Sequence, residues 1–182
     1  MDIKNTIYNR NPLMVLSYLS KSKNHVYGSR IASDIGINQG SVSLILKFFE
    51  GMGIIKGEET GKTILYSADS DNPIIKAFRV FENLIEINPL VQRIKSLSRK
   101  IVLFGSCASG SDNAESDMDV FIVADKENKS KIIEQISNFD AAREINPVIV
   151  DVYELMDMDK DDKAFLDEVG KGIILWDGGE DE

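Results

Sequence analysis

The chain has 182 residues, of which 43% are hydrophobic and 28% are charged, and this composition excludes collagen-like, low-complexity and intrinsically disordered proteins. Its single cysteine, Cys107, excludes an intramolecular disulfide and is typical of a reducing compartment. No apolar run approaches the roughly 18 residues that a membrane-spanning helix needs, and the first residues lack the apolar core of a signal peptide. We therefore expect a cytoplasmic protein without a membrane partner.

The net charge of −9 is unevenly distributed along the chain. Residues 1–70 carry eight Lys and Arg against six Asp and Glu, whereas residues 71–182 carry 13 against 24. Because nucleic acids attract basic surfaces, any DNA contact should come from the first part. The acidic second part favours either metal ligands or plain solvation.

Three helical patterns follow one another before residue 52. Asn11 and Pro12 are typical of an N-cap and a first helical position. A second helix is predicted from about Ser29 to Gly36, because glycine readily adopts the left-handed conformation at a helix end. Asn38 then caps a third helix. The apolar stripe of this third helix consists of Val42, Ile45, Leu46 and Phe49, which have helical spacing.

Two short β-prone runs come next, at residues 54–56 and 63–66, and residues 59–61 between them predict a hairpin turn. Over about residues 10–68, this order of elements resembles the winged-helix repressors of prokaryotes. The segments that carry the resemblance are 31–37, 41–43 and 50–55. The resemblance implies that the third helix reads the major groove of DNA and that the hairpin is the wing.

The resemblance indicates a set of candidate DNA-binding residues. They are Gln39, Ser41, Ser43 and Lys47 on the third helix, with Lys56 and Lys62 on the wing. Leu44 and Phe48 lie off the apolar stripe, and an apolar outer face there favours contact with another protein instead. Winged helices serve both purposes, so DNA binding and protein docking remain alternatives.

Residues 71–97 are predicted to be a helical connector between a winged-helix domain, residues 1–70, and a second domain, residues 98–178. Asp71 can cap the first connector helix, with Pro73 in its first turn. Asn88-Pro89 should break the connector into two helices. The connector would dock the two domains against each other or pair two copies of the chain.

The second domain contains the residues that indicate chemistry. Two buried strands are predicted, at 101–104 and 120–124. The first ends in Gly105-Ser106, and Asp117 and Asp119 precede the second. Residues two apart on a strand point to the same face, so the two carboxylates should lie together. Such a pair is costly without a cation, and oxygen ligands favour Mg²⁺. Backbone amides after the glycine could bind phosphates, so the pattern indicates nucleotidyl or phosphoryl transfer.

At this point the sequence resembles the DNA polymerase β-type nucleotidyltransferase superfamily, and its short "minimal" members in particular. The resemblance covers about residues 98–177. The residues that carry it are Phe104, Gly105, Ser106, Ala108, Gly110, Ser116, Asp117 and Asp119. It implies an α+β chain in which a mixed sheet flanked by helices follows the winged helix. Gly105 and Ser106 would hold a nucleoside triphosphate, and Asp117 and Asp119 would hold Mg²⁺.

The family normally adds a third carboxylate from a later strand, which helps to activate the attacking hydroxyl. Asp151 is the acid on that strand in this sequence and is our candidate third catalytic residue. If the sequences are aligned at the end of this strand, the family's third acid falls near Val148. In that case this chain lacks the third carboxylate, and Asp151 caps the end of the strand. Arg143, nearby, is either a phosphate ligand or a solvated side chain, and Cys107 is expected to pack.

Together these observations predict Mg²⁺-dependent transfer of a nucleoside monophosphate from a nucleoside triphosphate to a hydroxyl. The small domain would depend on a partner protein or a second chain to complete its site, and some minimal members of the family modify a partner toxin. A first alternative is a DNA-binding transcriptional regulator whose second domain only binds nucleotide. A second alternative is a pure interaction module.

Overall fold

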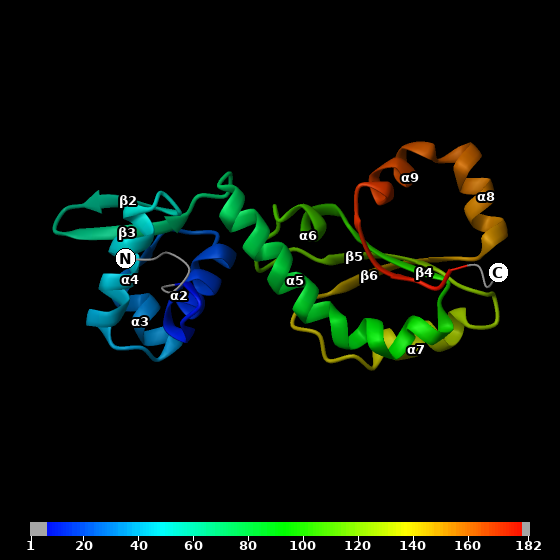
Figure 1. Cartoon of the computed structure of the whole chain (residues 1–182), viewed down its shortest axis with the longest axis horizontal. Coiled ribbons are helices and arrows are strands. Elements are labelled where there is room, and N and C mark those ends of the chain that lie inside the picture. The colour runs from blue at the N-terminus through cyan, green and yellow to red at the C-terminus, as the bar shows by residue number, and fades with distance from the viewer. Residues whose placement is uncertain (1–6, 180–182) are drawn as a thin grey trace. The chain divides into compact units, whose positions relative to one another are not determined.

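The computed structural model describes residues 7–179. Contacts divide the chain into two compact units, Met1–Arg79 and Val80–Glu182, and one helix, α5 (Pro73–Ile94), spans the boundary. Each unit combines helices with a sheet of its own, which confirms the predicted α+β class (Figure 1). Within residues 7–179, no helix is both long and apolar enough to cross a membrane.

The first unit is a winged helix. Its helices are α2 (Arg10–Lys21), α3 (Gly28–Ile35) and α4 (Gln39–Gly51). Its strands are β1 (Val26–Tyr27), β2 (Ile55–Thr60) and β3 (Thr63–Ala68), which form an antiparallel sheet in the order β1-β3-β2. Strands β2 and β3 make the hairpin wing, and the helices pack against the sheet through a core that includes Val15, Ile31, Leu46 and Phe49.

Most of the predicted helix ends in this unit are confirmed. Gly36 follows α3 with φ of +68°, a left-handed conformation that glycine tolerates without strain. The Asn38 side chain accepts a hydrogen bond from the Ser41 amide at 2.9 Å and so caps α4. The prediction for α2 was wrong by two residues, because the N-cap is Asn9 and Asn11 lies inside the helix.

Helix α5 does not break where the sequence predicts. Pro89 lies inside one continuous helix from Pro73 to Ile94. A proline there removes one backbone hydrogen bond, and burial of the neighbouring Ile87 and Leu90 in the core of the second unit compensates for the loss. At the start of the helix, the side chain of Asn72 accepts a hydrogen bond from the Ile74 amide at 2.8 Å.

The second unit is built around a mixed sheet of four strands in the order β6-β5-β4-β7. The strands are β4 (Lys100–Phe104), β5 (Met118–Val123), β6 (Ile145–Val150) and β7 (Ile173–Asp177). Strand β4 is antiparallel to β5 and β7, whereas β5 and β6 are parallel. The remaining elements are η1 (Lys95–Leu97), α6 (Gly105–Ser109), α7 (Lys129–Ser137), α8 (Val152–Asp161) and α9 (Lys163–Gly170).

Helices cover both faces of this sheet, as the predicted architecture requires. Because side chains alternate along a strand, Val120 and Ile122 of β5 pack on the side of α5 and α7, and Phe121 and Val123 pack on the side of α8 and α9 (Figure 1). Phe165 of α9 contributes aromatic contacts to this second face. Asp119 belongs to the same face as Phe121, and this placement determines the surroundings of the candidate site.

Candidate active site at the start of strand β5

Asp117 and Asp119 lie where the sequence predicts, at the beginning of β5. Asp119 pairs in the antiparallel ladder with Phe104, the last residue of β4, and Asp117 directly precedes the strand. The two residues are two positions apart, so both side chains project from one face of the sheet. Asp117 is exposed and Asp119 is half-buried.

Gly105 brings the backbone after β4 into direct contact with this pair. Its φ is +68°, and a Cβ at this position would lie only 2.7 Å from Oδ2 of Asp119. A side chain there would add backbone strain and would displace the Asp119 carboxylate, so glycine is favoured at this position. The close approach places the Gly105-Ser106 backbone beside the Asp119 carboxylate.

The electrostatics of the pair favour a bound cation. Burial raises the pKa of the Asp119 carboxyl, and the neighbouring charge of Asp117 raises it further, while a hydrogen bond from Asn146 acts in the opposite direction. The Asn146 amide also donates to Oδ2 of Asp117 at 3.2 Å. Carboxylate oxygens are the ligands that Mg²⁺ prefers, and a cation between them would relieve their repulsion. The side chains therefore fit a magnesium ion.

Asn146 occupies the place on β6 next to Asp119. In the parallel register, Asp119 pairs with Asn146 and Phe121 pairs with Val148. Val148 packs against the core with Phe121, so neither position on this face supplies an acid. Among residues 7–179, no group of three or more His, Cys, Asp or Glu side chains is arranged to hold a metal ion. The site thus has two carboxylates and an amide.

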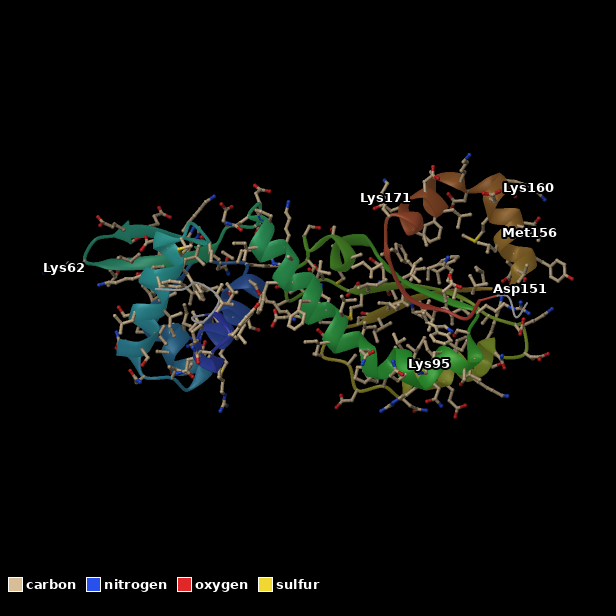
Figure 2. The ribbon with its side chains drawn as sticks, viewed as in Figure 1. Lys62, Lys95, Asp151, Met156, Lys160 and Lys171 are labelled. Carbon is tan, nitrogen blue, oxygen red and sulfur yellow. The ribbon has the colours of Figure 1, made fainter. Side chains whose placement is uncertain are left out.

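Asp151 lies at the other end of β6, and the expectation that it joins the carboxylate pair is wrong. At about 3.3 Å per residue, it is roughly 16 Å along the strand from Asn146. It follows the end of the strand, as the alternative prediction has it, but its side chain caps α8 by accepting hydrogen bonds from the amides of Tyr153 and Glu154 at 2.9 and 3.0 Å. These backbone bonds and the nearby Lys129 lower its pKa. Figure 2 labels Asp151 at the start of α8.

Arg143 is neither solvated nor available to a phosphate. Its side chain is 6% exposed and donates to the carboxylates of Asp112, at 2.9 Å, and Glu86, at 3.0 Å. It also donates to Oδ1 of Asn83 at 2.7 Å and lies 3.6 Å from the Cys107 sulfur. The sequence alone does not indicate this cluster, because Asn83 and Glu86 are two of eight polar residues on α5.

Cys107 packs as predicted, and it also contributes a hydrogen bond. Its side chain is fully buried, and its sulfur lies 3.3 Å from the backbone carbonyl of Asp117, to which the thiol donates. Burial, together with the Asp112 charge, raises the pKa of the thiol to about 11. The group is therefore protonated at neutral pH and is a poor nucleophile.

In the first unit, the structure brings four of the candidate DNA-binding side chains together. Gln39, Ser43, Lys47 and Lys62 line one cavity of about 320 Å³ between α4 and the wing. Ser41 does not line it, and its amide is engaged by the N-cap.

The expected apolar outer face of α4 is smaller than the sequence suggests. Leu44 is 72% exposed, as expected. Phe48 instead packs against the core and lies beside Phe49, with ring centroids 5.9 Å apart. Of these two residues, Leu44 is therefore the exposed one outside the apolar stripe of α4.

A comparison with known families finds a match in the second unit. Residues 84–170 match the family model described as a nucleotidyltransferase domain. Over these residues the second unit is similar to that family. The matched residues run from within α5 through the Gly105-Ser106 turn and the aspartate pair to the end of α9. The predicted resemblance is confirmed at this level. No curated protein sequence matches the chain.

Several solved structures resemble part of the chain. They include a predicted DNA-binding transcriptional regulator from E. coli, with 18% identity, a TM-score of 0.39 and coverage of 44% of this chain and 82% of that one. AF1382 from Archaeoglobus fulgidus has 24% identity and a TM-score of 0.38, and the match covers 46% of this chain and 97% of AF1382. A winged helix-turn-helix DNA-binding domain from Mycobacterium bovis has 16% identity and a TM-score of 0.40, and the match covers 47% of this chain and 77% of that domain. These scores are too low to support a functional conclusion.

Proposed function

We propose that the second unit binds a magnesium-bound nucleoside triphosphate and transfers its nucleoside monophosphate to a hydroxyl group. The hydroxyl oxygen would bond to the α-phosphorus, and the bond between the α- and β-phosphates would break with release of pyrophosphate. Asp117 and Asp119 would hold the ion, and Gly105 and Ser106 would contact the phosphates. The observation that carries the proposal is the close approach of Gly105 to Asp119, because a Cβ at residue 105 would displace the Asp119 carboxylate. That contact joins a metal-ligand carboxylate to backbone that a phosphate can approach.

Two carboxylates are sufficient for this type of site. Mg²⁺ in phosphoryl-transfer proteins is commonly held by one or two carboxylates together with the substrate phosphates. When bound, the ion would neutralise charge that develops on the transferred phosphoryl group. The chain's own residues would orient the triphosphate, because Asp119 is fixed against Gly105 and Asp117 is held by the Asn146 amide.

The missing third acid limits the proposed reaction. An amide such as Asn146 cannot accept the proton of an attacking hydroxyl, and general-base assistance is typically worth about 10²–10⁴ in rate. Transfer by this chain alone should therefore be slow. A partner protein or a second chain that presents the acceptor, with a base of its own, would restore the rate.

A second candidate function is a nucleotide-sensing regulator, in which the domain binds nucleotide without transferring it. The presence of Asn146 beside Asp119, and the capping role of Asp151, favour this alternative. In both cases, we propose that the winged helix supplies a DNA contact through Gln39, Ser43, Lys47 and Lys62, with Ser41 nearby on the helix.

A transfer assay distinguishes the two functions. The protein is incubated with Mg²⁺ and each α-labelled nucleoside triphosphate, with and without lysate from its source, beside an Asp117→Ala, Asp119→Ala double variant. A labelled macromolecule that depends on the native aspartates supports the transferase. Tight nucleotide binding without label transfer supports the sensor, and the absence of both contradicts the proposed site.

A further inference from the structure

A buried polar cluster lies beneath the candidate site. We call it the Arg143 cluster, and it consists of Arg143, Asn83, Glu86, Asp112 and Cys107. Asn83 and Asp112 are fully buried, with exposed fractions of 0% and 1%. The side chain of Arg143 is 6% exposed and that of Glu86 is 19% exposed. The charges of the cluster are thus largely removed from water.

The cluster is hydrogen-bonded throughout. Arg143 donates to both acids and to Asn83, as described above. The amide nitrogen of Asn83 in turn donates to Oδ1 of Asp112 at 3.0 Å. Arginine has five donors in a rigid plane, so four separate partners determine the position of its side chain within narrow limits.

Two segments of the candidate site are hydrogen-bonded to this cluster. Asn83 donates to the backbone carbonyl of Cys107 at 3.0 Å and so holds the helix that begins with Gly105-Ser106. The Cys107 thiol donates to the backbone carbonyl of Asp117. Arg143 itself lies three residues before Asn146, on the segment that enters β6. The cluster therefore contacts the helix of the glycine turn and the backbone of Asp117, and its Arg143 lies three residues along the chain from Asn146.

Stability alone does not explain such an arrangement. Replacing a buried ion pair with apolar side chains of similar volume is often neutral or stabilising, so an apolar cluster could hold these segments together at least as tightly. Directional hydrogen bonds differ from apolar contacts because they define position and orientation. A site that must place a carboxylate correctly benefits from that directionality.

We propose that Arg143 and Cys107 are positioning residues for the metal–nucleotide site. In this role, Arg143 locates the Cys107 segment and Asp112, and the Cys107 thiol locates the backbone of Asp117. This inference rests on the proposed function. In the ligand-free protein, the cluster also restrains the backbone around Ser106.

The first test compares Arg143→Met with a matched control, Arg99→Met. Arg99 forms an exposed ion pair with Asp125 at 2.9 Å in the same unit and contacts none of the site residues named here. At a temperature at which both variants are folded by circular dichroism, calorimetry measures Mg-ATP binding. Arg143→Met is expected to raise the dissociation constant about tenfold or more, since small displacements of site groups have large effects. Arg99→Met is expected to leave it unchanged, and native affinity in folded Arg143→Met would overturn the proposal.

A second pair of variants applies even where Arg143→Met does not fold. Cys107→Ser keeps a donor toward the Asp117 carbonyl, whereas Cys107→Ala removes it at nearly the same size. We expect weakened Mg-ATP binding in Cys107→Ala and near-native binding in Cys107→Ser. Equal affinities in the two variants would overturn the role of the thiol.

Hydrogen exchange separates the inference from the proposed function. The Ser111 amide donates to the Ser106 carbonyl at 3.1 Å, so its exchange reports on this turn without any nucleotide. Cys107→Ala and Arg143→Met should accelerate its exchange relative to amides of β4, whereas Arg99→Met should not. A native protein that fails to bind Mg-ATP refutes the proposed function, while unchanged Ser111 exchange in both variants refutes the positioning role.

Discussion

The variant Gly105→Ala tests whether the glycine turn serves binding rather than folding. With φ at +68°, an alanine in the left-handed region costs about 1–2 kcal/mol of stability. Its Cβ would also lie 2.7 Å from Oδ2 of Asp119, below the contact distance of real side chains. Because the obstructing atom is the end of a side chain, the carboxylate can rotate away at little further cost in stability. The displaced carboxylate, however, can no longer bind the metal correctly.

The matched control is Gly36→Ala, at the end of α3. Gly36 has the same φ of +68°, but nothing lies within 4 Å of the position its Cβ would take. Both variants should therefore lose about 1–2 kcal/mol in urea unfolding. Calorimetry should show that Gly105→Ala raises the Mg-ATP dissociation constant about tenfold or more, with Gly36→Ala unchanged. Equal affinities in the two variants would refute the assignment of Gly105 to the site.

Three further predictions concern single residues. Asp151→Ala should lower the melting temperature without changing Mg-ATP affinity. The pKa of Asp151 is lower in the folded than in the unfolded protein. The stability difference between the native protein and the variant should therefore be complete above about pH 4 and disappear as the pH falls through the lowered pKa. The Cys107 thiol, with a pKa of about 11 and no exposed surface, should react with a thiol reagent at pH 8 only after denaturation, and rapid reaction of the folded protein would contradict its burial. Lys62→Ala should weaken DNA binding and reduce the slope of log affinity against log salt by about one unit, as Lys47→Ala should, whereas unchanged slopes would argue for a protein partner.

The elements that depend on local sequence were predicted well. Gly36 and Asn38 define helix ends through their own backbone and side-chain chemistry, and the hairpin turn at Gly61 follows from a single left-handed residue. The Asp117 and Asp119 pair also follows from local alternation along a strand. In each case the deciding interactions lie within a few residues of one another, so a pattern in the sequence suffices.

The features that depend on distant contacts were not predicted. Pro89 remains inside α5 because burial of its neighbours in the second unit outweighs one lost hydrogen bond. The partner of Asp119 is Asn146 because of the register between β5 and β6, and a shift along that ladder would change which residue faces the site. The Arg143 cluster joins residues up to 60 positions apart, so no local pattern indicates it.

The central claim is that Asp117 and Asp119 form a metal–nucleotide site, and titration of the protein with Mg-ATP in a calorimeter tests it most directly. We expect saturable binding by the native chain, which disappears when Mg²⁺ is replaced by a chelator. Asp119→Ala should lose this binding while retaining the circular dichroism spectrum of the native protein. Unchanged Mg-ATP affinity in folded Asp119→Ala would show that the two aspartates are not the metal–nucleotide site.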